Sequence, residues 1–121
     1  MKKILIIEDE PSLAEALRQK LTKEKFDAVV AKDGQEGLVT ALKNKPDLIL
    51  LDIVMPVMDG LTMLEKLRQD KWGKNVPVII LSNLNEADKT AEAMAKGVYD
   101  YLVKSDWKLE DLVKKVREKI K

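Results

Sequence analysis

Five short apolar runs, each followed by a segment of helical periodicity, constrain the fold of this chain more than any other feature. The runs have the length of buried strands and are apolar at nearly every position. They cover Ile4–Ile7, Phe26–Ala31, Leu48–Asp52, Val76–Ser82 and Tyr99–Val103. Near-continuous apolar strands are typical of a parallel sheet that is covered by helices on both faces. The pattern therefore predicts an α/β fold with a doubly wound, five-stranded parallel sheet.

Helix signals fill the intervals between these runs. Leucines recur every four residues after Pro11, and Pro11 suits the first position of a helix. Asp33 and Glu36 have the spacing of a capping box, and Gly97 is a helix stop signal. The remaining helices are predicted at about 60–69, at about 86–96 and after a cap at Asp106.

The length of 121 residues suits a single domain, 1–121, with a sizeable core. Lysine and arginine number 22 and the acidic residues 21, so net charge gives no argument for binding nucleic acid or an anionic membrane. No apolar run approaches eighteen residues, and the apolar run near the start is too short for a signal peptide. We expect no nucleic acid or membrane partner and, by default, a cytoplasmic location.

The chain contains neither cysteine nor histidine. Disulfides, thiolate metal sites, histidine general bases and phosphohistidine on this chain are therefore excluded. Any chemistry must use carboxylates, hydroxyls and lysines.

Polar residues that could take part in binding or catalysis lie at the carboxyl ends of four predicted strands. Glu8 and Asp9 follow the first, Asp52 ends the third, Ser82 ends the fourth and Lys104 follows the fifth. Ligands bind at this edge in open α/β sheets. If the first and third strands are neighbours, three carboxylates converge, and a hard divalent cation such as Mg²⁺ would relieve their repulsion. A lysine and a hydroxyl at the rim then suit a tetrahedral anion.

Each of these residues also has a purely structural interpretation. Acids after a strand often cap the next helix, so the Glu8-Asp9 pair could do only that. Ser82 alone suits a turn, Lys104 alone suits solvent, and Asp59-Gly60 suits a turn and helix start. The joint pattern at four separate strand ends favours a functional site.

The chain resembles the response regulator receiver domains, of the single-domain kind that includes the bacterial chemotaxis response protein. The resemblance rests on "IIEDE", "LLDIVMPVMDG", "VIILSN" and "YDYLVKS" in the right order, and on the D-x-x-x-P-x-x-x-G spacing of Asp52, Pro56 and Gly60. It covers the whole chain and implies a flavodoxin-like (βα)5 fold with strand order 2-1-3-4-5.

The resemblance also implies a metal site and a phosphoacceptor. Mg²⁺ would be held by Glu8, Asp9, Asp52 and the backbone carbonyl of Val54. Asp52 would accept a phosphoryl group from a histidine kinase or a histidine phosphotransfer protein of a two-component phosphorelay. A carboxylate at the end of a rigid strand is well placed for in-line attack that forms an acyl phosphate.

The resemblance also implies which residues would convert phosphorylation of Asp52 into a changed protein-binding face. Lys104 would pair with the phosphoryl group, the hydroxyl of Ser82 would follow it, and Tyr101 would be the switch aromatic. The output would be a protein-binding face made by the fourth helix, fifth strand and fifth helix, read by a downstream protein. The chain would thus be a signalling switch and not an enzyme, apart from slow self-phosphorylation and dephosphorylation.

Alternatives and departures from the family pattern remain. An aspartyl-phosphate phosphatase would need a general acid near Asp52, commonly at the place of Val54, which cannot serve. An inert docking domain conflicts with the complete set of site residues, and a nucleotide-binding flavodoxin-like domain lacks a glycine-rich phosphate loop. Apolar Val54 and Leu84 stand where polar groups can control hydrolytic water. Ser105 replaces the family's usual proline, and we expect a trans peptide bond before it.

Overall fold

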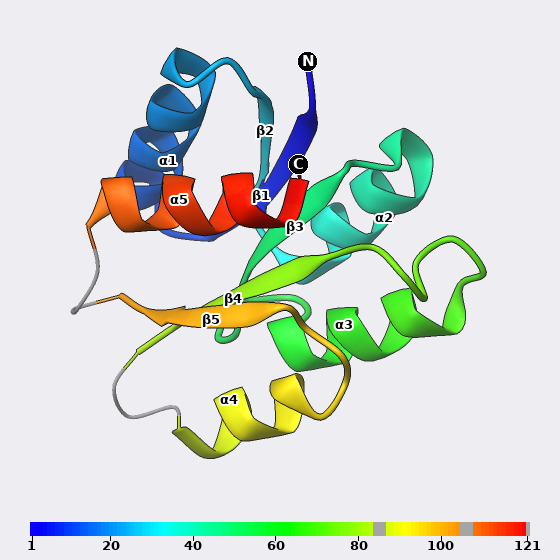
Figure 1. The fold of residues 1–121 in the computed structure, drawn as a ribbon. Coiled ribbons are helices and arrows are strands. Elements are labelled where there is room, and N and C mark those ends of the chain that lie inside the picture. The colour runs from blue at the N-terminus through cyan, green and yellow to red at the C-terminus, as the bar shows by residue number, and fades with distance from the viewer. Residues whose placement is uncertain (84–86, 105–107, 121) are drawn as a thin grey trace.

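The computed structural model describes residues 1–83, 87–104 and 108–120, apart from the side chain of Ser82. Within these residues strands and helices alternate strictly (Figure 1). The strands are β1 (Lys3–Ile7), β2 (Asp27–Ala31), β3 (Leu48–Asp52), β4 (Val78–Ser82) and β5 (Asp100–Val103). The helices are α1 (Pro11–Lys23), α2 (Gly34–Asn44), α3 (Gly60–Gln69), α4 (Ala87–Met94) and α5 (Leu109–Ile120).

All neighbouring strands pair in parallel, in the order β2-β1-β3-β4-β5. This confirms the predicted doubly wound sheet and its strand order. The register places Ile7 beside Leu51, and Asp52 beside Leu81. The carboxyl ends of β1, β3 and β4 therefore lie at one edge of the sheet, with β1 and β3 as direct neighbours.

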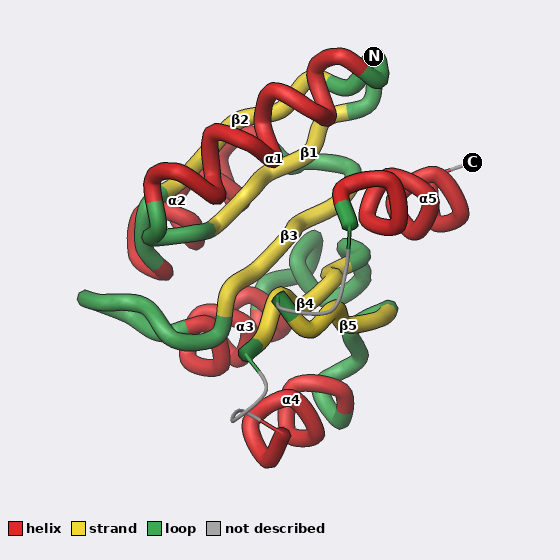
Figure 2. The backbone as a smooth tube through the Cα atoms, turned by 90° about the vertical axis from the view of Figure 1, so that its left-hand side faces the viewer, coloured by secondary structure: helices red, strands yellow, loops and turns green. Residues whose placement is uncertain are grey.

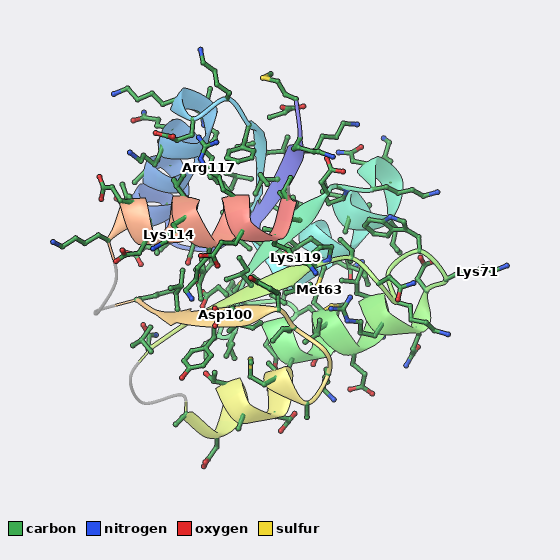
Figure 3. The ribbon with its side chains drawn as sticks, viewed as in Figure 1. Met63, Lys71, Asp100, Lys114, Arg117 and Lys119 are labelled. Carbon is green, nitrogen blue, oxygen red and sulfur yellow. The ribbon has the colours of Figure 1, made fainter. Side chains whose placement is uncertain are left out.

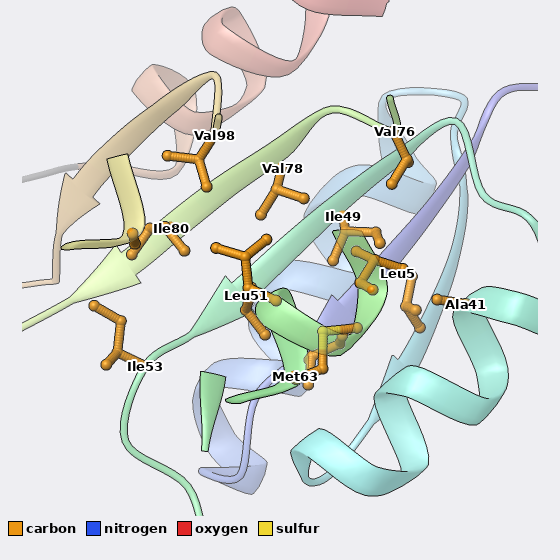
Figure 4. Packing of buried hydrophobic residues seen from close by; sticks show 14 of the residues in the cluster. Leu5, Ala41, Ile49, Leu51, Ile53, Met63, Val76, Val78, Ile80 and Val98 are labelled. Carbon is orange, nitrogen blue, oxygen red and sulfur yellow. The ribbon is translucent and has the colours of Figure 1, made fainter. Parts of the chain in front are cut away.

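Helices cover both faces of the sheet: α1 and α5 lie on one side and α2, α3 and α4 on the other (Figure 2). Successive residues of a strand point to opposite faces. Leu51 and Ile80 therefore pack with Met63 of α3 in one core cluster, which Figure 4 shows from close by. Leu50 and Leu81 belong to a second core cluster, which lies between the sheet and helices α1 and α5. Among the described helices, none is long and apolar enough to span a membrane.

Three strands begin later than the sequence predicts: β2 begins at Asp27, one residue after the predicted Phe26, and β4 and β5 are also shorter at the start. β4 begins at Val78 and not at Val76, because Pro77 has no backbone N–H to donate to a neighbouring strand. β5 begins at Asp100, one residue after the predicted start. The helix before it ends at Met94, and Gly97 then adopts φ +78°, the left-handed conformation that glycine tolerates.

The predicted helix starts are confirmed where the structure describes them. Pro11 is the first residue of α1, and the Asp33 carboxylate accepts a hydrogen bond from Glu36 N at 2.8 Å. Asp59 caps α3 in the same way through Thr62 N, at 2.8 Å. The predicted cap Asp106 and the Lys104–Ser105 peptide bond lie outside the described residues, as does Leu84.

Arg68 near the end of α3 fixes the position of α4. Its guanidinium donates hydrogen bonds of 2.8–3.2 Å to four backbone carbonyls, those of Gly73, Val76, Lys96 and Gly97. Two of these acceptors lie just beyond the carboxyl end of α4, where a cation is also favoured by the helix dipole. Burial lowers the pKa of Arg68 from its usual value.

Candidate functional site

The carboxyl edge of the sheet brings two predicted acids and the predicted lysine into direct contact. Lys104 Nζ lies 2.9 Å from Glu8 Oε1 and 3.2 Å from Asp52 Oδ2. Glu8 follows β1, Asp52 ends β3 and Lys104 follows β5, so three separate segments build the cluster. The interpretation of Lys104 as a solvated lysine is therefore wrong.

Both acids of this cluster are almost completely buried. Glu8 is 1% exposed and Asp52 is 2% exposed. Burial, and then the charge of Glu8, raise the pKa of Asp52 to about 8, against the opposing effect of Lys104. Burial alone would lower the pKa of Lys104, but its hydrogen bond to Glu8 and the charges of both acids raise it above its usual value. Lys104 is thus held as a cation beside a carboxylate that repulsion and burial have made basic.

Asp9 completes a cluster that fits a divalent cation. One carboxylate oxygen each from Glu8, Asp9 and Asp52 can be chosen so that all three lie within 4.8 Å of one another. Asp9 is exposed, which leaves the cluster open to solvent on one side. Asp52 Oδ1 is buried and has no hydrogen-bond partner among the described residues. A buried carboxylate oxygen without a partner is costly, and a hard cation with oxygen ligands would satisfy it.

In the described part of the chain, no hydrogen bond joins the Glu8 or Asp9 side chain to the first turn of α1 beyond the N-cap residue. Glu10 occupies the N-cap position, but its side chain makes no capping hydrogen bond. Instead Glu8 Oε2 accepts a hydrogen bond from Glu10 N at 3.0 Å. This contact orients one oxygen of Glu8 toward the backbone and the other, Oε1, toward Lys104.

The loop after Asp52 explains the glycine of the D-x-x-x-P-x-x-x-G motif. Gly60 N donates a hydrogen bond to Ile53 O at 2.7 Å, and a Cβ on Gly60 would lie 2.2 Å from the carbonyl oxygen of Asp52. Only glycine permits this close approach. The turn is thereby closed directly behind the carboxylate that ends β3.

A strained turn lies at the tip of the same loop. Val57 has φ +68°, which is a genuine outlier for a β-branched residue. Met58 N donates to Pro56 O at 2.7 Å across it, and Met58 O accepts from Gly34 N at 3.0 Å. Gly34 begins α2, and a Cβ there would lie 2.1 Å from Met58 O. The sequence alone did not predict that Gly34 holds this loop, because in the sequence Gly34 is only the residue that follows the helix cap Asp33.

The other predicted residues lie around this centre. Val54 is two residues beyond Asp52 in the loop, and the residue is 49% exposed. Ser82 ends β4 one position after Leu81, the register partner of Asp52, while its side chain lies outside the described part of the structure. Tyr101 lies on β5 and is 43% exposed. It lines a hollow of about 460 Å³ between β5 and α4, together with Thr90 and Met94.

Comparison with known proteins agrees with this geometry. The family described as response regulator receiver domain matches residues 4–117 of this chain. The chain therefore belongs to the receiver domains of two-component response regulators, which are phosphorylation-activated signalling switches.

Curated relatives share about a third of its residues. Over 97% of this chain, the sequence is 33% identical to the DNA-binding dual master transcriptional regulator RpaA of Synechocystis sp.. Over 97% of this chain, it is also 36% identical to response regulator ArlR of Staphylococcus saprophyticus. It spans only 48% of RpaA and 51% of ArlR. The remaining half of each relative has no counterpart in this sequence.

Solved structures resemble the whole chain. The chemotaxis protein CheY4 of Vibrio cholerae superposes with a TM-score of 0.89 at 29% identity and covers 98% of both chains. The receiver domain of sensor histidine kinase PA1611 from Pseudomonas aeruginosa gives a TM-score of 0.89 at 26% identity, with coverage of 98% of this chain and 97% of that one. That second structure has a magnesium ion coordinated in its active-site cleft.

Proposed function

We propose that Asp52 is the phosphoacceptor of this receiver domain. The observation that carries the proposal is the buried contact among Asp52, Glu8 and Lys104 at the carboxyl edge of the sheet. Asp52 is fixed at the end of a fully buried strand, so its carboxylate has little freedom to move. A fixed carboxylate beside a fixed cation is suited to in-line attack on a phosphoryl group.

The transfer would use groups that the site already holds. A carboxylate oxygen of Asp52 forms a bond to phosphorus while the bond from phosphorus to the donor histidine nitrogen breaks. The imidazole leaves with the bonding electron pair, and an acyl phosphate remains on Asp52. Lys104 already lies 3.2 Å from Asp52 Oδ2 and would stabilise the negative charge that arrives with the phosphoryl oxygens.

Glu8, Asp9 and Asp52 would hold a Mg²⁺ ion, with the carbonyl of Val54 as a further ligand. The unpartnered Asp52 Oδ1 supports this assignment, because a metal would satisfy it. When bound, Mg²⁺ supplies positive charge to phosphoryl oxygens. The exposed position of Asp9 leaves room for water ligands, which Mg²⁺ usually keeps.

The output would be a changed protein-binding face and not a released product. The hydroxyl of Ser82 would follow the phosphoryl group, and Tyr101 would turn from its exposed position toward the hollow between β5 and α4. A histidine kinase or a histidine phosphotransfer protein would supply the phosphoryl group. A downstream protein would bind the face of α4, β5 and α5.

Intact-mass spectrometry after incubation with phosphoramidate tests this proposal. The wild-type mass should rise by one phosphoryl group with Mg²⁺ and should not rise with EDTA. Asp52→Asn should abolish the rise, while Asp27→Asn, at an exposed acid on β2, should retain it. Equal labelling of the Asp52→Asn protein would show that the phosphoacceptor lies elsewhere.

A further inference from the structure

A second concave site lies on the outer strand of the sheet, away from Asp52. A cavity of about 250 Å³ is formed between the beginning of the sheet and the last turns of α2. Its apolar part comes from Leu5, Val29 and Pro46, and its polar part includes Thr40 and Asn44. β2 is an edge strand, and Val29 on it is 44% exposed. The cavity thus opens beside a strand that is paired on one side only, with β1, and it has room for one or two side chains.

One lysine lines this cavity, and three more lie within two residues of its lining residues along the chain. Lys3 lines it, Lys43 and Lys45 flank its lining residue Asn44, and Lys25 lies two residues before its lining residue Asp27. All four lysines are exposed, and none takes part in an ion pair among the described residues. Farther along the same end of the sheet, Lys71 extends away from the body of the protein (Figure 3).

The acids near this end offset only part of that charge. Glu24 is paired with Lys20 and Arg117, whereas Asp47, next to the lining residue Pro46, accepts a hydrogen bond from the backbone Lys3 N at 2.7 Å and keeps its charge. Asp27 is the acid that lines the cavity itself. The basic character is therefore local, although the whole chain has a formal net charge of only +1.

Two of these lysines occupy positions where glycine is the favoured residue. Lys25 has φ 75° and Lys45 has φ 48°, and both follow the ends of helices. The left-handed conformation is uncommon for a lysine and is usually taken by glycine at helix ends. At the end of α4, in contrast, Gly97 takes the left-handed conformation. Lysine is thus present at two positions where local backbone preference opposes it, and such exceptions are expected at functional surfaces.

We propose that this cavity and its lysine rim bind an acidic protein segment with one apolar anchor residue. The apolar hollow would take the anchor side chain, and flanking carboxylates would face Lys3, Lys25, Lys43 and Lys45. A protein segment fits better than a nucleic acid or a membrane, because a concave apolar hollow suits a single side chain. The rim also lacks the arginines that recognise phosphate through paired hydrogen bonds.

Fluorescence polarisation with a labelled peptide tests this proposal. The probe has one leucine flanked on each side by glutamates, and the control peptide has serine in place of leucine. Wild-type protein should bind the leucine peptide more tightly than the serine peptide, and added salt should weaken both. Equal affinity for the two peptides would overturn the proposal, because the cavity would then contribute nothing.

Matched variants separate the cavity from the general surface. Val29→Glu, in the cavity, should weaken binding by about tenfold, comparable to the loss of one anchoring side chain. Val39→Glu, at a 55% exposed valine on α2 that does not line the cavity, should leave the affinity unchanged. Asp27→Asn should tighten binding, because it removes the lining acid. Equal weakening by both valine substitutions would contradict the proposal.

Lys45→Gly gives a test in which folding and binding change in opposite directions. It should raise the melting temperature, because glycine relieves the left-handed conformation, and yet weaken peptide binding by about threefold. Unchanged peptide affinity in a well-folded Lys45→Gly protein would exclude the lysine rim. A DNA duplex or anionic vesicles that bind more tightly than the peptide, with sensitivity to Val29→Glu, would likewise overturn the assignment to a protein segment.

Discussion

Replacement of Asp52 by asparagine should stabilise the metal-free protein. The pKa of Asp52 is raised from 3.8 to about 8, first by burial and then by the charge of Glu8. At 1.36 kcal/mol per pKa unit, this shift places an upper limit of about 6 kcal/mol on the cost of its charge. Asparagine removes that cost but also removes one partner of Lys104, so we expect a net gain of about 2–4 kcal/mol near pH 8.

The sign of the pH dependence follows from the same shift. A raised pKa means that the native state holds a proton which the unfolded state has released. The free energy of unfolding should therefore fall as pH rises from about 4 to about 8, and Asp52→Asn should flatten this slope. Saturating Mg²⁺ should restore much of the lost stability of wild type, since the cation replaces the proton in relieving carboxylate repulsion.

Urea denaturation and thermal unfolding at several pH values, with EDTA or with Mg²⁺, measure these effects. The melting temperature of Asp52→Asn should exceed that of metal-free wild type by about 10 °C at neutral pH. Asp27→Asn is the matched control, because it makes the same substitution at an exposed acid and should show the wild-type slope. A less stable Asp52→Asn protein, or one that keeps the wild-type pH slope, would refute this account of the site.

Three further predictions concern the metal, the loop and the output face. Mg²⁺ should raise the melting temperature of wild type and raise it less in Asp9→Ala; equal shifts would exclude Asp9 as a ligand. Val57→Gly should increase the free energy of unfolding in urea by about 1 kcal/mol, since glycine tolerates φ +68°; a decrease would show that the turn is not strained. Beryllofluoride, an acyl-phosphate mimic, should shift NMR signals from the Asp52 loop as far as Tyr101 on β5; signals that change only around the metal loops would contradict the switch.

The order of the elements and the edge that carries the site could be predicted from the sequence, because both follow from local patterns. Four of the five apolar runs end in, or are followed by, a polar residue of the predicted site, and the carboxyl ends of parallel strands share one edge. The contact of Lys104 with Glu8 as well as Asp52 could not be predicted, since it depends on how the segment after β5 approaches β1 and β3. Strand boundaries were inexact where a proline intervened, as at Pro77.

The conformation of the loop after Asp52 also could not be predicted from the sequence. The motif marks Gly60 as special, but only the structure shows that the carbonyl of Asp52 leaves no room for a Cβ there. Nothing in the residue type of Val57 suggests a left-handed backbone, because valine disfavours it. The cavity beside Val29 was missed for a similar reason: its lining comes from β1, β2 and α2, and no single segment carries its signature.

Chemical identification of the modified residue tests the central claim most directly. Borohydride reduces an aspartyl phosphate to homoserine, so tandem mass spectrometry after phosphoramidate, Mg²⁺ and borohydride treatment locates the acyl phosphate. The account predicts homoserine at position 52 in wild type, none when EDTA replaces Mg²⁺, and little in Lys104→Met. Homoserine at Asp9, or at any other acid while position 52 remains aspartate, would contradict it.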